Sequence, residues 1–147
     1  WNLNHPMWLM RRALKYMIPQ EHGRIMSVSS MYGKVVLATQ APYCTTKHAL
    51  NGLTKVVAQE VGTLGITVNA LCPGGILTDI MQEQGPAAAE QLGLSFEDFL
   101  TMMQAPSAIK RMNTVEDCAL VAVLLASEAG AGITGSLISI DGGQSPY

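Results

Sequence analysis

The sequence predicts an α/β fold, in which helices cover both faces of a parallel sheet. Three apolar or β-branched segments, residues 24–30, 66–72 and 136–143, have the length and composition of buried strands. They alternate with helical segments of ten or more residues, which is typical of parallel strands joined by right-handed crossovers. Three strands are few for a sheet that is covered on both faces. We therefore expect the chain, which begins with Trp1 inside a helical pattern, to be part of a longer protein.

The first part of the chain predicts a helix, a strand and a second helix. Apolar residues recur at helical spacing over about residues 6–19, and residues 20–23 end this helix. Residues 24–30 form the first strand, and residues 31–41 form a loop. Pro42 opens the second helix, because proline favours the first helical turn. The buried stripe of this helix is expected to contain Leu50, Leu53, Val57 and Val61.

The second part predicts two more strands with helices between them. Gly62 and Gly65 end the second helix, and the strand 66–72 ends at Pro73. A long segment, residues 76–112, contains a short helix over residues 96–103. Thr114 then begins another helix in a capping box with Asp117, and residues 136–143 form the last strand. The apolar face of the capped helix is expected to contain Leu120, Val121, Leu124 and Leu125.

The composition describes one globular domain and excludes several functions. The 147 residues are 48% hydrophobic and 14% charged, which suits a well-buried core. The net charge of −2, without a run of Lys or Arg, argues against a nucleic-acid partner. No continuous apolar stretch reaches the ~18 residues of a membrane span. Three cysteines without C-x-x-C spacing favour a reduced, cytoplasmic chain, and we predict no metal site.

A tyrosine and a lysine lie one turn apart at the start of the second helix, where Tyr43 and Lys47 share a helix face. Ligands of open α/β sheets bind at the carboxyl ends of the strands, and Ser30 ends the first strand. A phenol has a pKa of about 10, and a nearby ammonium moves it toward the neutral range of a general acid or base. The pair also occurs by chance in many chains, and a serine that ends a strand is usually a cap.

Four segments in order, GRIMSVSSMYG, YCTTK, ITVNALCPGGILTD and ITGSLISIDGG, resemble the short-chain dehydrogenase/reductase family. Ser30 lies thirteen residues before Tyr43, and Asn2 lies twenty-eight residues before Ser30, as in the family pattern. The match runs over residues 2–143. The resemblance implies a Rossmann-like doubly wound parallel sheet, of which the last three strands are in this chain.

The resemblance also implies the roles of four catalytic residues. Tyr43 is the general acid/base for interconversion of a secondary alcohol and a ketone. Lys47 lowers the pKa of Tyr43 and hydrogen-bonds the nicotinamide ribose. Ser30 orients the substrate oxygen, and Asn2 holds a water of the proton path. Tyr43 thus contacts both the substrate and the cofactor.

The same resemblance implies that NAD or NADP is bound by the segment after the second strand. Pro73 and Gly74 turn the chain beneath the cofactor, and glycine lets the backbone approach a flat ligand closely. The backbone of Ile76 and the hydroxyl of Thr78 meet the nicotinamide carboxamide. The family's glycine-rich fingerprint and its N-N-A-G segment are absent from the sequence. Residues 1–147 are therefore expected to be a single domain, the C-terminal catalytic part, without the N-terminal dinucleotide-binding half.

The predicted substrate lid, residues 79–112, is rich in methionine, which adapts to apolar ligands, although most of these side chains can simply pack the lid on the body. The lid length and the segment KHAL resemble the 3-hydroxybutyrate dehydrogenase branch. That branch grips a carboxylate with a histidine and a lysine, at the positions of Tyr32 and Gln40 here. We therefore expect Tyr32 and Gln40 to hydrogen-bond a neutral polar alcohol or ketone. His48 faces away from Lys47 and is expected to be structural.

Two other functions stay open at this point. Related proteins use the Tyr/Lys pair with bound NAD for epimerisation, although the short lid and the terminal IDGG favour a simple dehydrogenase. A non-catalytic fragment or binding module is the third hypothesis, because the pyrophosphate loop is missing. The resemblance implies a homotetramer, paired through second faces of the two helices that begin near residues 6 and 42. These faces carry Trp8, Leu9, Ala49, Gly52 and Val56.

Overall fold

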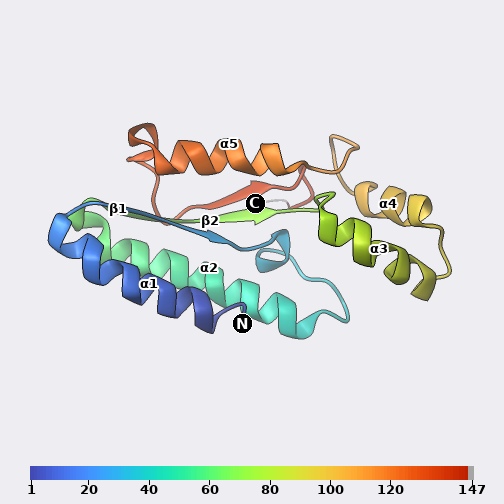
Figure 1. Ribbon diagram of the computed structural model, residues 1–147, viewed down its shortest axis with the longest axis horizontal. Coiled ribbons are helices and arrows are strands. Elements are labelled where there is room, and N and C mark those ends of the chain that lie inside the picture. Colours follow the sequence, from blue (N-terminus) through green and yellow to red (C-terminus); the bar gives the residue numbers. More distant parts are fainter. Residues whose placement is uncertain (146–147) are drawn as a thin grey trace.

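The computed structural model describes residues 1–145 and confirms the α/β class (Figure 1). Strands β1 (Gly23–Val28), β2 (Ile66–Pro73) and β3 (Leu137–Ile140) form a parallel sheet in the order β1-β2-β3. Helices α1 (Asn4–Met17) and α2 (Ala41–Val61) cover one face, and α5 (Val115–Ala126) covers the other. Helices α3 (Asp79–Gln91) and α4 (Phe96–Gln104) lie beyond the carboxyl end of β2. This arrangement is the Rossmann-like one that the resemblance implied.

Helix α1 begins two residues before the predicted start at residue 6, and Pro6 is therefore its third residue. The backbone N–H of that position has no partner inside a helix, so proline is tolerated there. A 3₁₀ turn, Ile18–Gln20, follows α1 and leads into β1. β1 then runs from Gly23 to Val28, two residues short of the predicted end.

The core lies between α1, α2 and the sheet. Most of the predicted stripe of α2 is buried there, and Leu53 is partly buried against it. Gly65 turns the chain into β2 with a φ of 68°, and a Cβ at this position would lie 2.4 Å from the carbonyl oxygen of Glu21. The buried core cluster is Met10, Ile25, Leu50, Val57, Ala58, Val61, Ile66 and Val68.

Helix α3 was not predicted from the sequence, and it contains Gly85 and Pro86, two residue types that disfavour the interior of a helix. The structure shows why glycine stands there. A Cβ on Gly85 would lie 2.4 Å from Cε2 of Phe96, so the absent side chain lets the Phe96 ring of α4 pack against α3. The two helices therefore form a packed hairpin, and α4 ends one residue beyond its predicted bound.

The capping box of Thr114 and Asp117 at the start of α5 is confirmed. The predicted apolar face of α5 is wrong in part. Leu125 is buried, but Leu120 and Leu124 are exposed, because the side of α5 that bears them does not face β1 and β2, the strands on which this helix packs. The last strand is shorter than predicted, since Gly142 and Gly143 have φ values of 66° and 82° that turn the chain out of the sheet. Among residues 1–145, no helix has both the length and the apolar character needed to cross a membrane.

Candidate active site

The carboxyl end of β1 continues into two buried serines. The backbone N–H of Ser29 donates to the carbonyl of Leu71 at 2.8 Å, which extends the pairing with β2 by one residue. Ser30 has extended backbone angles, and its Oγ accepts a hydrogen bond of 3.1 Å from the N–H of Tyr32. A hydroxyl is both donor and acceptor, so the Oγ–H of Ser30 remains able to donate to another group.

The first turns of α2 are fastened to this strand end by two hydrogen bonds. Ser29 Oγ donates to the carbonyl of Lys47 at 3.4 Å, and Asn51 Nδ2 donates to the carbonyl of Gly33 at 2.8 Å. Gly33 is required at that contact, because a Cβ would lie 2.6 Å from Asn51 Nδ2. Asn51 was not among the predicted site residues. The signal that points to it is its position, four residues after Lys47 on the same face of the helix.

Tyr43 and Lys47 lie together, as their spacing predicted. The Nζ of Lys47 is 5.5 Å from the centroid of the Tyr43 ring, and it donates a hydrogen bond of 2.9 Å to the carbonyl of Val28. Lys47 is buried, and burial lowers the pKa of its ammonium, while the nearby Cys72 thiol acts in the opposite direction. The ammonium is therefore held by a main-chain acceptor rather than by a carboxylate.

Tyr32 and Gln40, the two residues predicted to hydrogen-bond a neutral polar substrate, differ in their environment. Tyr32 is half-buried in the 3₁₀ turn Met31–Gly33, and burial raises the pKa of its phenol, with further contributions from Cys44 and Tyr43. It therefore stays protonated and can donate a hydrogen bond at neutral pH. Gln40 is exposed directly before α2, where its main-chain carbonyl accepts from the N–H of Cys44 at 2.9 Å.

The segment after β2 makes a tight turn against β3. Gly74 donates its N–H to the carbonyl of Ile140 at 3.0 Å, and a Cβ on Gly74 would lie 2.8 Å from the Cα of Asp141. The N–H of Thr78 donates to the carbonyl of Ile76 at 3.0 Å. Thr78 also caps α3, with its Oγ1 accepting from the N–H of Met81 at 3.3 Å. This turn follows Pro73, the last residue of β2.

The structure brings Ser30, Tyr32, Tyr43 and Lys47 to one edge of the sheet, but it does not link Asn2 to them. Asn2 is exposed before α1, and within residues 1–145 no hydrogen bond joins its side chain to the other predicted catalytic residues. His48 is exposed, and its Nδ1 lies 2.9 Å from the carbonyl of Cys44, in agreement with a structural role. In the described part of the chain, no group of three or more His, Cys, Asp or Glu residues is arranged to hold a metal ion.

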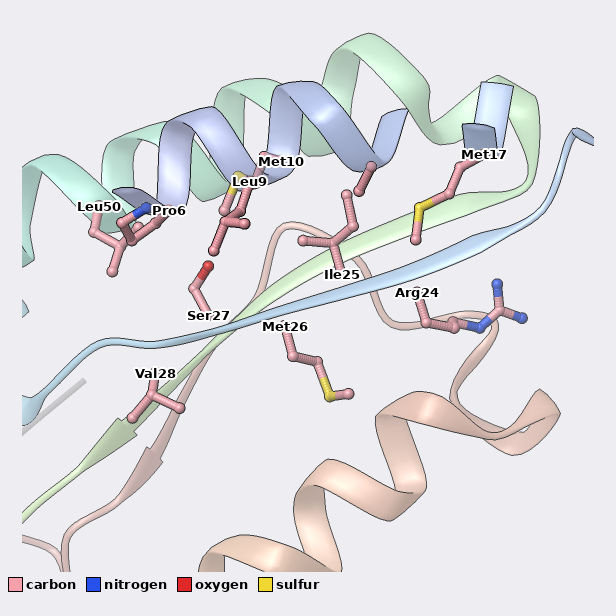
Figure 2. A pocket seen from close by; sticks show the side chains of 11 residues that line it. Pro6, Leu9, Met10, Met17, Arg24, Ile25, Met26, Ser27, Val28 and Leu50 are labelled. Carbon is pink, nitrogen blue, oxygen red and sulfur yellow. The ribbon is translucent and has the colours of Figure 1, made fainter. Parts of the chain in front are cut away.

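Two grooves lie along helix α1. One of about 360 Å³ runs between α1 and β1, where Ile25 and Ser27 point toward α1 while Met26 and Val28 point to the opposite face (Figure 2). It follows the edge of β1 that no strand of the described residues pairs with. A second groove, of about 370 Å³, lies between α1 and α2 and is lined by residues such as Met7, Leu14 and Leu53.

The parallel sheet and the helical layers on its two faces define the class as a Rossmann-type α/β protein. A family model described as enoyl-(acyl carrier protein) reductase matches residues 1–145. The chain belongs to the short-chain dehydrogenase/reductase family.

Three similar proteins illustrate the range of this family. The chain is 37% identical to the D-beta-hydroxybutyrate dehydrogenase of Rhizobium meliloti, over 97% of this chain and 55% of that protein. It is 35% identical to the 3-oxoacyl-[acyl-carrier-protein] reductase FabG of Pseudomonas aeruginosa, over 97% and 53%. A solved actinorhodin polyketide ketoreductase with NADPH superposes with a TM-score of 0.92 at 28% identity, over 99% and 57%. The chain thus spans about half the length of the relatives it matches.

Proposed function

We propose that this chain is the catalytic, C-terminal part of an NAD(P)-dependent oxidoreductase that interconverts a secondary alcohol and a ketone. The observation that carries the proposal is the position of the Lys47 ammonium, 5.5 Å from the Tyr43 ring centroid at the carboxyl edge of the sheet. The relatives are almost twice as long as this chain, which supports a dinucleotide-binding half outside it. The unpaired edge of β1 is where further strands of the sheet would add.

In this proposal Tyr43 exchanges a proton with the substrate oxygen. The Lys47 ammonium favours the phenolate, because an opposite charge in a partly desolvated site stabilises the anion. During alcohol oxidation the phenolate takes the hydroxyl proton, and during ketone reduction the phenol returns it. Ser30 donates its Oγ–H to the same oxygen and holds it in line. A bound nicotinamide supplies the hydride acceptor or donor.

The residues after β2 fit a nicotinamide. Gly74 and Gly75 form a tight turn at the carboxyl edge of the sheet, where a Cβ on either residue would collide with Asp141 or Met112. The Thr78 oxygen accepts from Met81, so its hydrogen is available to a carboxamide oxygen. In our proposal Pro73 and Gly74 support the ring and Ile76 meets the carboxamide through its backbone. Lys47 and Tyr43 contact the ribose, and Asn2 holds a water next to Lys47, for which the family pattern is the support.

We propose a neutral alcohol or ketone as the substrate rather than a carboxylate. Residues 79–104, which contain α3 and α4, carry five acidic residues and no Lys or Arg: Asp79, Glu83, Glu90, Glu97 and Asp98. The ammonium of Lys34 is engaged with the carbonyl of Leu137 at 3.2 Å and with Ser139 Oγ at 2.8 Å. Tyr32 and Gln40 can hydrogen-bond a neutral polar group, and neither adds a positive charge that would hold a carboxylate.

The groove between α1 and α2 supports the proposal of a homotetramer paired through these helices. Its apolar lining is open in one chain, and exposed apolar residues such as Trp8 and Val56 lie on the same two helices. The three cysteines are free thiols, which supports a reducing, cytoplasmic location.

The test of this function is cofactor-dependent turnover. We expect the full-length protein to oxidise neutral secondary alcohols, or reduce the matching ketones, with NAD or NADP. The isolated residues 1–147 should not bind either dinucleotide with micromolar affinity, since the half that holds the pyrophosphate is missing. A full-length protein without any such turnover over a broad alcohol and ketone panel would contradict the proposal. Micromolar binding by the isolated chain would contradict the assigned division into two halves.

A further inference from the structure

Asn113 lies where three segments of the chain meet. Its side-chain Nδ2 donates to the carbonyl of Ile140 at 2.8 Å, and its main-chain N–H donates to the carbonyl of Gly75 at 3.0 Å. The residue is 4% exposed. Ile140 is the last residue of β3, and Gly75 follows β2. Asn113 therefore ties the segment after the lid to the carboxyl ends of two strands.

The carbonyl of Ile140 is shared between two donors. It also accepts the N–H of Gly74 at 3.0 Å, which its two lone pairs allow. An isolated parallel bridge pairs Ile76 with Asn113. The backbone from Gly74 to Ile76 is consequently held by β3 on one side and by Asn113 on the other.

Asn113 is itself held in place by its neighbours. Thr114 caps α5 in the capping box with Asp117, and the Arg111 guanidinium donates to the Asp117 carboxylate at 2.7 Å. This ion pair and the cap hold the pKa of Asp117 at about 2. The Met112 side chain covers Gly75, where a Cβ would lie 2.8 Å from Met112 Cε. The asparagine side chain thus projects from a braced turn.

We propose that Asn113 is a positioning residue, which fixes the Gly74–Ile76 backbone in the conformation that receives the nicotinamide carboxamide. This inference rests on the proposed function and adds to it a residue that contacts no ligand. Recognition by main-chain groups needs those groups held within about 0.5 Å, so a bond that braces the backbone contributes to selectivity. Any other non-proline residue at position 113 keeps an N–H for Gly75, but only a suitable side-chain donor reaches Ile140.

The experiment compares three variants of the full-length protein. Asn113→Ala removes the side-chain donor, while the Ile140 carbonyl keeps the N–H of Gly74. Asn113→Asp preserves the shape, but an ionised carboxylate only accepts hydrogen bonds and would face a carbonyl. Ser107→Ala is the matched control. Ser107 is fully buried in the same connecting segment and donates to the carbonyl of Gly142 at 3.2 Å, without a hydrogen bond to Gly74–Ile76.

The readout is binding, followed by fluorescence titration with the reduced nicotinamide dinucleotide and with its 3-acetylpyridine analogue, in which a methyl group replaces the carboxamide amino group. We expect wild type to prefer the natural cofactor. Asn113→Ala should lower the affinity for the natural cofactor about five- to tenfold, which is the effect of one ordinary hydrogen bond. It should lower the affinity for the analogue much less. Asn113→Asp should lose at least as much, and Ser107→Ala should keep the wild-type preference. Amide hydrogen exchange of residues 74–77 without cofactor should accelerate in both Asn113 variants and not in the control.

The outcomes separate this inference from the proposed function. If wild type binds the cofactor and both Asn113 variants keep its preference over the analogue, the positioning role is wrong and the proposed function stands. If Ser107→Ala and Asn113→Ala lowered the cofactor affinity equally, Asn113 would have only a general structural role. This result would also overturn the inference. A wild-type protein that binds no nicotinamide dinucleotide would overturn both. Should Asn113→Ala not fold, Asn113→Asp decides the question in the same titration.

Discussion

The ammonium of Lys47 donates a hydrogen bond of 2.9 Å to the carbonyl of Val28, the last residue of β1. This bond crosses from α2 to the strand end and holds the ammonium 5.5 Å from the centroid of the Tyr43 ring. The main-chain oxygen carries no formal charge, so this hydrogen bond does not neutralise the ammonium next to the phenol.

Tyr43→Phe removes the hydroxyl that exchanges the proton and keeps the ring that packs at the start of α2. We expect turnover by the full-length protein to fall by roughly 10²–10⁴-fold, the usual contribution of a general acid/base. The melting temperature and cofactor titration verify that the variant is folded. A variant that retains more than about a tenth of wild-type turnover would show that another group moves the proton.

Lys47→Met removes the ammonium and keeps much of the side-chain volume. The phenolate then loses its stabilising charge, so the apparent pKa of the step that uses Tyr43 should rise. In a pH–rate profile of alcohol oxidation, the rate increase that accompanies loss of the Tyr43 proton should therefore occur at higher pH. Lys55→Met, at an exposed lysine of the same helix, is the control and should leave the profile in place. An unmoved profile with reduced turnover in Lys47→Met would mean that Lys47 mainly binds cofactor.

Tyr32 and Gln40 are expected to set the preference for a neutral substrate. The double variant Tyr32→His with Gln40→Lys supplies cations at the mouth of the site. We expect kcat/KM for short 3-hydroxy acids to rise by about tenfold or more, because a hydrogen bond to a charged group contributes about 1.5–3 kcal/mol. The double variant should have a lower kcat/KM for neutral alcohols than the wild type. Wild type that already prefers a hydroxy acid over its neutral ester would contradict the predicted substrate class.

Oligomer formation through α1 and α2 is tested at Val56, which is 57% exposed on α2. Val56→Glu places a charge in the proposed helix-to-helix contact and should convert the tetramer to smaller species, as measured by light scattering of the full-length protein. Val123→Glu introduces the same charge at a residue that is 67% exposed on α5, on the other face of the sheet, and should leave the tetramer intact. A wild-type protein that is monomeric would refute the proposed assembly.

Much of the fold and part of the site follow from local patterns in the sequence. Alternating strand and helix patterns predict the parallel sheet, and the capping box predicts the start of α5. The four-residue spacing of Tyr43 and Lys47 places them on one face, because helical geometry relates neighbours along the chain. The spacing of Ser30 and Tyr43 carries the family resemblance. The roles of these residues stay predictions that the experiments above test.

Other features were decided by the tertiary structure, because they depend on residues that are distant in the chain. Helix α3 contains Gly85, a poor helix former, and the Phe96 ring occupies the space that a side chain there would need. Burial of α5 depends on which elements cover it, so the apolar pattern alone did not reveal that Leu120 is 73% exposed.

The clearest feature decided by the tertiary structure is the pair of hydrogen bonds to the carbonyl of Ile140. Gly74 and Asn113 come from different loops, and each donates to this one carbonyl at the end of β3. No local pattern predicts such a meeting, since a side chain–backbone hydrogen bond between distant residues leaves no periodic signal in the sequence. The sequence alone predicted the three strands, the other four α-helices and the helix face that bears the tyrosine and the lysine. The packed sheet determined which backbone groups hold them, because parallel pairing brings the ends of separate strands to one edge.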